Sequence, residues 1–170
     1  VDTLSLQSAG LNMNNYDLSV NNLDNQGGIS MGSGALTLSS ITNMGHFEFT
    51  VARDLPNYTS AGLSLSDPSF GTFTTAGDLS ASSLYVSGSI LNMGDYNLGV
   101  GYLATNSSGI VVMGVGDLTV GTLDNQYYIS MGTGALNLTD ITTMGEFDFM
   151  VARELPNYTY SGLFLSDSSL

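Results

Sequence analysis

The 170-residue sequence contains no cysteine and no tryptophan, and two arginines are its only strongly basic residues. Without cysteine, the chain can form neither a disulfide framework nor a thiolate metal site. Fifteen acidic residues stand against those two arginines and give a formal net charge of −13. A surface of this charge repels phosphate backbones, so nucleic acid is excluded as an expected partner.

The sequence also lacks any run of eighteen apolar residues and any secretory signal at its start, so we expect no membrane-spanning helix. Lysine is absent, whereas Ser, Thr, Asn and Gly are abundant. This composition is more typical of a protein on the extracellular, virion or cell surface than of a cytosolic enzyme. Because the sequence begins at Val1, we expect a mature product or a piece of a longer chain.

A long tandem repeat is the most informative feature that is present. Residues 23–70 recur as residues 123–170, and 32 of these 48 positions are identical. Residues 4–20 recur less closely as residues 84–100, at an offset of eighty instead of one hundred. The two offsets differ by twenty residues, so the second copy holds one additional unit near residues 101–120. Repeats on this scale indicate a solenoid or an array.

A shorter period lies inside the long repeat. Apolar residues alternate with polar ones over four to six positions, which is the pattern of strands with one buried face. One set of five apolar positions recurs eighteen residues later: Leu11, Met13, Leu18, Val20 and Leu23 become Ile29, Met31, Leu36, Leu38 and Ile41. We expect the second set to point inward, and Gly32 and Gly34 to turn the corner at positive φ.

These patterns predict an all-β fold, a β-solenoid or β-helix-like stack of rungs of about 18–20 residues. A stack of rungs accepts an additional rung easily, whereas a globular core does not, so the insert favours a solenoid over a sandwich. The predicted organisation is two tandem blocks. Residues 1–80 form the first, and residues 81–170 form the second, with its extra rung at 101–120.

The segment from Arg53 to Thr59 interrupts the alternation, and its counterpart is Arg153 to Thr159. Proline removes a ladder donor, so we expect a protruding loop or a strand end at each place. Each arginine precedes a carboxylate, and a guanidinium can bind carboxylates bidentately across a subunit contact. The candidate contact residues are therefore Arg53, Asp54, Arg153 and Glu154. The alternative is an exposed ion pair that contributes about 0–1 kcal/mol.

The sequence offers little for catalysis. His46 is the only histidine, and the second copy has Glu146 at its position. Two pairs of carboxylates could in principle hydrolyse glycans in the manner of a tailspike, namely Glu48 with Asp54 and Asp148 with Glu154. Carboxylates that alternate with aromatic residues more often form the solvated face of a strand. We expect no enzyme and assign no catalytic, cofactor-binding or metal-binding residue.

Two surface features suggest glycans. Four sequons make Asn57, Asn106, Asn137 and Asn157 candidates for N-glycosylation. The neighbouring Tyr127 and Tyr128 are candidates for stacking on a sugar, and the first copy has two glycines there. Cell-surface glycans are therefore a possible partner, although aromatic residues that fill the core or the surface are the alternative explanation.

The run Leu91-Asn92-Met93-Gly94-Asp95-Tyr96-Asn97-Leu98, with its echo at residues 11–18, resembles the short repeats of phage tail-fibre shafts. The usual continuation of that family, an Ala-Asp-Pro segment, is missing here. Fibrous surface adhesins and appendage proteins of bacteria look similar at this level. The resemblance implies a homo-oligomeric fibre built for attachment, either a trimer or an end-to-end polymer.

These observations predict a structural subunit that assembles with copies of itself into an extracellular fibre or filament. A carbohydrate-binding or receptor-binding adhesin shaft is the alternative, and a glycan hydrolase is a third possibility. The edges of a stack of strands polymerise unless they are capped. We therefore expect a neighbouring subunit, or further chain, to complete the rung near Leu170.

Overall fold

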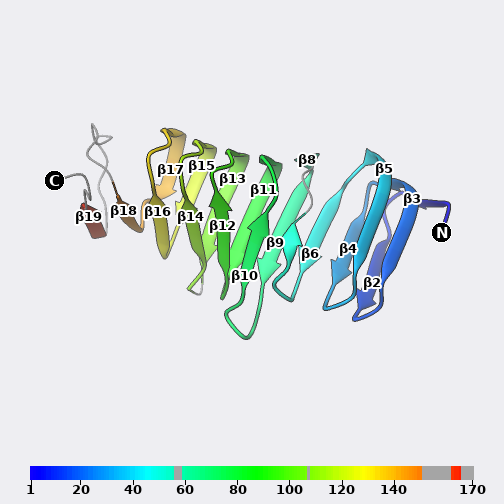
Figure 1. Ribbon diagram of the computed structural model, residues 1–170. Coiled ribbons are helices and arrows are strands. Elements are labelled where there is room, and N and C mark those ends of the chain that lie inside the picture. Colours follow the sequence, from blue (N-terminus) through cyan, green and yellow to red (C-terminus); the bar gives the residue numbers. More distant parts are fainter. Residues whose placement is uncertain (56–58, 107, 151–161, 166–170) are drawn as a thin grey trace.

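The computed structural model describes residues 1–55, 59–106, 108–150 and 162–165, with the backbone alone for residues 59, 60 and 162–165. The regular structure in these ranges is β-strand, and the strands stack into a β-solenoid of about 8 turns (Figure 1). This result confirms the predicted fold class. Within the same ranges, no helix is long and apolar enough to cross a membrane.

Three parallel sheets form the walls of the solenoid. The orders are β1-β3-β5 in the three-stranded sheet, β19-β18-β16-β14-β12-β10-β7 in the seven-stranded sheet, and β17-β15-β13-β11-β9-β6-β4-β2 in the nine-stranded sheet, where β8 also pairs with β11. The strands are β1 (Thr3–Leu6), β2 (Gly10–Asn14), β3 (Leu18–Asn25), β4 (Gly28–Met31), β5 (Leu36–Asn43), β6 (His46–Phe49), β7 (Asp54–Leu55), β8 (Thr59–Ser60), β9 (Gly62–Ser66), β10 (Thr72–Thr75), β11 (Leu79–Ser87), β12 (Ile90–Gly94), β13 (Leu98–Asn106), β14 (Ile110–Met113), β15 (Leu118–Asn125), β16 (Tyr128–Met131), β17 (Leu136–Thr143), β18 (Glu146–Phe149) and β19 (Gly162–Leu165).

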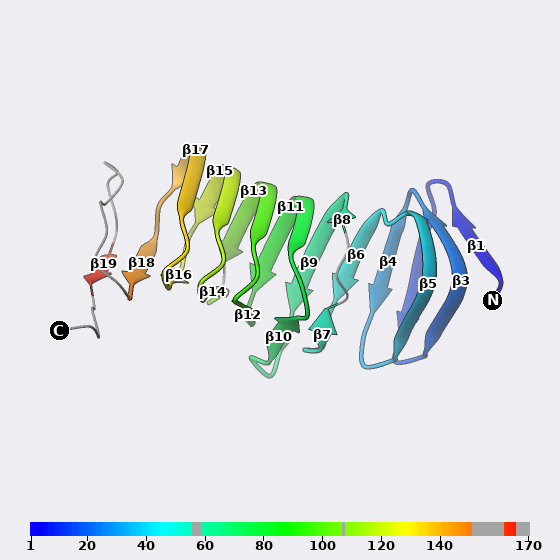
Figure 2. The same ribbon diagram turned by 45° about the horizontal axis from the view of Figure 1, so that its top comes forward.

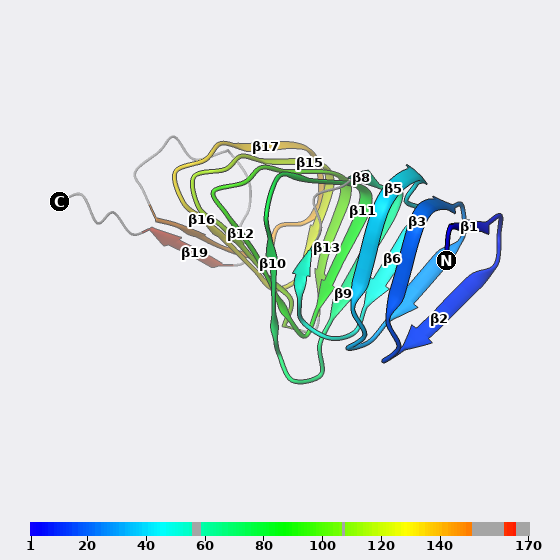
Figure 3. The same cartoon turned by 45° about the vertical axis from the view of Figure 1, so that its right-hand side comes forward.

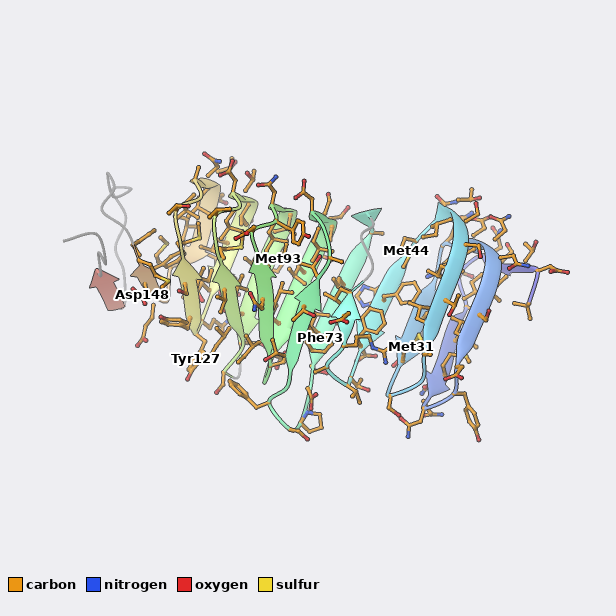
Figure 4. The ribbon with its side chains drawn as sticks, in the orientation of Figure 1. Met31, Met44, Phe73, Met93, Tyr127 and Asp148 are labelled. Atoms are coloured by element: carbon orange, nitrogen blue, oxygen red, sulfur yellow. The ribbon has the colours of Figure 1, made fainter. Side chains whose placement is uncertain are left out.

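The alternating sequence produces the core directly. In β4, Ile29 and Met31 are buried, as predicted, while Ser30 between them is only partly buried. Apolar side chains from successive turns meet along the axis, and Figure 4 shows Met31, Phe73 and Met93 between the walls. A fully buried side chain of this size stabilises the fold by about 1.5–3 kcal/mol. The core is therefore a continuous column.

The ladder between β13 and β15 has a register of twenty residues. Val100 in β13 pairs with Val120 in β15, and Tyr102 pairs with Thr122. Residues 101–120 therefore make one complete turn. The neighbouring turn, from β15 to β17, has a register of eighteen residues, since Leu118 pairs with Leu136. In Figure 3 the turns from β12 to β17 nest in projection, so the insertion lengthens the stack without interrupting it.

Two buried asparagines fasten the turns that follow the long strands. The side-chain nitrogen of Asn125 donates to the carbonyl oxygens of Met144 at 2.7 Å and Glu146 at 3.1 Å. Its side-chain oxygen accepts from the Tyr127 N–H at 3.2 Å and from the Thr105 hydroxyl. Asn25 repeats the arrangement one block earlier. It donates to Met44 at 2.8 Å and accepts from the Gly27 N–H at 3.0 Å.

Glycine at the corners serves close packing, so the prediction of positive φ at Gly32 and Gly34 is wrong. The glycines at positive φ include Gly45 and Gly145, which begin the turns into β6 and β18. A Cβ atom on Gly34 would instead meet the carbonyl group of Tyr16 in the previous turn. Glycine is needed there because the backbones of two stacked turns approach each other closely.

The two copies of the repeat enter different sheets. β3 and β5 belong to the three-stranded sheet, but their sequence equivalents β15 and β17 belong to the nine-stranded sheet. Likewise β6 lies in the nine-stranded sheet and its equivalent β18 in the seven-stranded one. The exchange takes place at β9, which pairs with β6 on one side and with β11 on the other (Figure 2).

The sheet exchange leaves β5 at the edge of its sheet. Leu36 and Leu38 are therefore only partly buried, and Ile41 is 40% exposed. The prediction that Ile41 points into a closed core is wrong, because among the described residues no strand of the same sheet covers β5 on that side.

At the segment that begins at Arg53, the described residues follow the strand-end alternative of the prediction and not the protruding loop. Asp54 and Leu55 form β7, which pairs with β10, and Leu55 is buried in the core. Two residues of the expected protrusion thus belong to the wall of the solenoid. The next residues, 56–58, lie outside the described ranges.

Candidate functional site

The clearest candidate for an interaction surface is one end of the stack, formed by β1 and β2. We call it the β1–β2 end surface and define it by Leu4, Leu6, Leu11 and Met13. These side chains are only partly buried, although they pack against the core cluster. β1 pairs with β3 and β2 pairs with β4, and neither strand pairs on its other side within the described chain.

The same sequence positions are closed eighty residues later. Leu84, Val86, Leu91 and Met93 correspond to the four residues of the end surface, and each is 0% exposed. The difference therefore lies in what stacks on them and not in the residues themselves. Apolar side chains and strand edges that lie open together are typical of a surface that binds another chain.

Arg53 makes contacts inside the turn stack. Its guanidinium donates to the carbonyl oxygen of Gly34 at 3.0 Å and to that of Gly32, and it lies 4.8 Å from the centre of the Phe49 ring. The Asp54 carboxylate accepts a hydrogen bond from the Thr74 hydroxyl on β10. Arg153 and Glu154 lie outside the described residues. A subunit contact through these four residues stays a prediction.

The outer face of β6 carries two polar side chains, His46 and Glu48. The Nε2 atom of His46 lies 3.3 Å from the Ser64 hydroxyl, and Glu48 occupies the ladder position between Ser30 and Ser64. Asp54, the expected partner of Glu48 in a carboxylate pair, belongs to the seven-stranded sheet instead. Across the described ranges, no three histidine, aspartate or glutamate side chains gather in a way that could hold a metal ion.

Tyr127 and Tyr128 differ in their surroundings. Tyr127 is 43% exposed and lies at the lower edge of the stack in Figure 4. Tyr128 is partly buried, and its hydroxyl donates to the Asp148 carboxylate at 3.1 Å. Burial raises the pKa of the Tyr128 phenol, and the hydrogen bond and negative charge of Asp148 raise it further. The two rings therefore do not present equivalent surfaces.

Tyr85 and Tyr102 form a second tyrosine pair, which the sequence did not predict. The rings of Tyr85 on β11 and Tyr102 on β13 lie 5.7 Å apart at an angle of 51°. The Tyr102 hydroxyl donates to the Asp124 carboxylate at 3.3 Å. Burial raises the pKa of this phenol most, and the charge and hydrogen bond of Asp124 raise it further. Aligning the rungs would have found the pair, because Tyr102 pairs with Ser83, two residues before Tyr85.

The four sequons differ in position. Asn137 is exposed on β17, whereas Asn106 is partly buried at the end of β13. Asn57 and Asn157 lie outside the described ranges. Glycosylation stays a prediction at all four positions.

No protein-family model, no curated protein and no solved structure matches this chain.

Proposed function

We propose that this protein is a structural subunit of an extracellular fibre and that copies of it stack end to end through their strand edges. The observation that carries the proposal is the contrast between the β1–β2 end surface and its counterpart in the second block. Leu4, Leu6, Leu11 and Met13 are partly open, whereas the equivalent residues are completely closed by the preceding turn. A turn supplied by a second copy would close the end surface in the same way.

The composition supports the proposed location and role. A net charge of −13 keeps the sides of such rods apart in solution, so association is favoured at the ends. The chain is rich in Ser, Thr, Asn and Gly, which is typical of an extracellular surface. The proposed role is mechanical and adhesive, and it needs neither a catalytic group nor a cofactor.

Negative-stain electron microscopy and light scattering of the purified protein test this function. We expect rods whose length grows with protein concentration. Leu6→Asp should raise the concentration needed for assembly at least about tenfold, which corresponds to about 1.4 kcal/mol, because an unpaired carboxylate would be buried in the contact. Ser5→Asp places the same charge on the exposed face of the same strand and serves as the control.

Circular dichroism should show the same β-sheet spectrum for both variants and the wild type. A wild-type protein that stays a monodisperse monomer at every soluble concentration would refute the proposed function. So would a Ser5→Asp variant that blocks assembly as strongly as Leu6→Asp, since the effect would then come from charge alone.

A glycan-binding shaft is the second candidate function, and the Tyr85–Tyr102 pair favours it. Aromatic rings beside a carboxylate are a common way to hold a sugar, because a ring packs on the apolar face of the sugar and the carboxylate accepts from its hydroxyls. Tyr85 is 40% exposed. Calorimetric titration with surface oligosaccharides should detect binding that Tyr85→Ala abolishes and Tyr16→Ala, at an exposed turn elsewhere, leaves unchanged.

A further inference from the structure

The junction between β9 and β11 joins two strands that each have a sequence equivalent at an end of the stack. Within one chain, β9 receives β11: Leu63 pairs with Leu84, Ser64 with Tyr85 and Leu65 with Val86. Leu63, Leu65, Leu84 and Val86 are all buried there. At this junction the nine-stranded sheet changes its kind of strand. On one side are strands of 4 or 5 residues, the short type (β2, β4, β6 and β9), and on the other are strands of 8 or 9 residues, the long type (β11, β13, β15 and β17).

Each partner in this junction has a second version elsewhere in the sequence. β19 is the equivalent of β9, one hundred residues later, and it pairs with β18 in the register that β9 uses with β6. Glu146 pairs with Gly162 just as His46 pairs with Gly62. The edge of β19 that corresponds to the β11 side of β9 has no partner among the described strands.

The equivalent of the second half of β11 is β1. Leu4 and Leu6 correspond to Leu84 and Val86 at the offset of eighty residues. β1 also pairs with β3 in the register that β11 uses with β13, since Thr3 pairs with Asn22 and Ser83 with Tyr102. β9 covers Leu84 and Val86 in the chain, whereas none of the described strands covers Leu4 and Leu6 in the same way.

We propose that β1 of one copy pairs in parallel with β19 of the next, in the register of the internal β9–β11 junction. Leu4 then lies opposite Leu163, Ser5 opposite Phe164 and Leu6 opposite Leu165. The contact joins two different surfaces that lie at opposite ends of the stack, so it repeats along the axis and produces an open filament (Figure 1). This inference rests on the proposed fibre function and specifies which strands meet and how they align.

Cross-linking of two single-cysteine proteins tests the register, and the absence of native cysteine makes the test clean. The proteins are Ser5→Cys and Phe164→Cys. Ser64 occupies the position equivalent to 164 in the first copy, so a small residue fits there. Paired positions on neighbouring strands lie about 4.8 Å apart, within reach of a short bis-thiosulfonate reagent.

A mixture of the two variants should give a covalent dimer, and either variant alone should not. Val112→Cys mixed with Ser5→Cys is the matched control. Position 112 leads through Ser130 and Asp148 to position 164, so it lies four strand spacings, about 19 Å, from Ser5 of the next copy. That pair should stay unlinked.

Electron microscopy of the same mixtures distinguishes a wrong register from a wrong fibre function. Filaments without a link between positions 5 and 164 would overturn the proposed register and leave the fibre function standing. A control pair that links as well as the test pair would also overturn the register. The absence of both filaments and links would refute the fibre function and the register together.

Discussion

Replacing Asn125 with alanine removes a hydrogen-bonded centre from the core of the solenoid. The Asn125 side chain is completely buried and takes part in four hydrogen bonds, with Met144, Glu146, Tyr127 and Thr105. A hydrogen bond between buried groups contributes about 0.5–1.5 kcal/mol, and a partner left unpaired costs more. The Thr105 hydroxyl can rotate to another acceptor, and the Tyr127 N–H still donates to that hydroxyl at 3.3 Å, whereas the carbonyl groups of Met144 and Glu146 lose the Asn125 donor. We therefore expect Asn125→Ala to lower the free energy of unfolding by about 3 kcal/mol.

Urea unfolding followed by tyrosine fluorescence measures this loss, because the chain has nine tyrosines and no tryptophan. Asn137→Ala is the control. Asn137 is exposed, and its only described side-chain hydrogen bond is a long one of 3.5 Å to Thr119, so the change should stay within about 0.5 kcal/mol. Equal effects of the two substitutions, or a loss below about 1 kcal/mol for Asn125→Ala, would refute the reasoning.

Asn125→Asp adds a test of sign. The carboxylate would face the carbonyl oxygens of Met144 and Glu146, whereas the protonated acid could donate to one of them. Burial and these carbonyls raise the pKa of the new carboxyl group in the folded state above its unfolded value of about 3.9. The folded state then binds more protons, so this variant should lose stability as the pH rises above about 4. A variant that is equally stable at pH 4 and pH 7, relative to the wild type, would contradict the assigned hydrogen bonds.

Three further predictions concern packing, titration and the arginine contacts. Gly116→Ala should destabilise the fold by about 1–3 kcal/mol in urea unfolding, because the added Cβ meets the backbone carbonyl of Tyr96, while Gly99→Ala, with no atom within 4 Å of its Cβ, should be tolerated. Because the folded-state pKa of Tyr128 is raised, the stability that this group contributes is complete below about pH 10 and is lost as the pH rises through the folded pKa. Tyr128→Phe should remove that alkaline loss, whereas Tyr127→Phe should not, as unfolding measured between pH 9 and about 12 will show. Arg53→Lys should cost about 1–2 kcal/mol in urea unfolding, since an ammonium group cannot reach both glycine carbonyls while covering Phe49; an unchanged midpoint would contradict this.

The regular parts of the fold could be predicted because they depend on local periodicity. Burial of Ile29 and Met31 follows from alternation alone, and the turn made by residues 101–120 follows from the difference between two sequence offsets. Both signals are local: they indicate which side chains of a strand are buried and how many residues make one turn. They hold wherever another rung stacks on that strand.

The burial of two asparagines could not be predicted from periodicity. Asn25 and Asn125 belong to the run Leu-Asp-Asn-Gln, which begins both copies of the long repeat at residues 23 and 123. An asparagine is usually exposed, and only the turn that follows brings its hydrogen-bond partners together. Burial of these two side chains depends on the path of the backbone at Met44 and Met144, which no periodicity reveals.

Which sheet a strand joins is also beyond periodicity. The equivalents β5 and β17 have similar sequences, and their partly buried residues are alike, yet they belong to different sheets. The choice is made at β9, because Leu63 and Leu65 pack beneath Leu84 and Val86 of a long strand and not beneath another short one.

The sheet exchange also determines what a fibre of this protein would present to its surroundings. Under the proposed register, each β1–β19 contact repeats the exchange that β9 and β11 make inside the chain. Strands of the long type would then move by one wall at every junction. A feature such as the Tyr85–Tyr102 pair, which lies on the nine-stranded sheet, would recur on successive walls around the axis instead of forming one straight row. A filament that binds glycans through this pair would therefore engage a surface from several sides, which suits attachment in any rotational orientation better than binding along a single face.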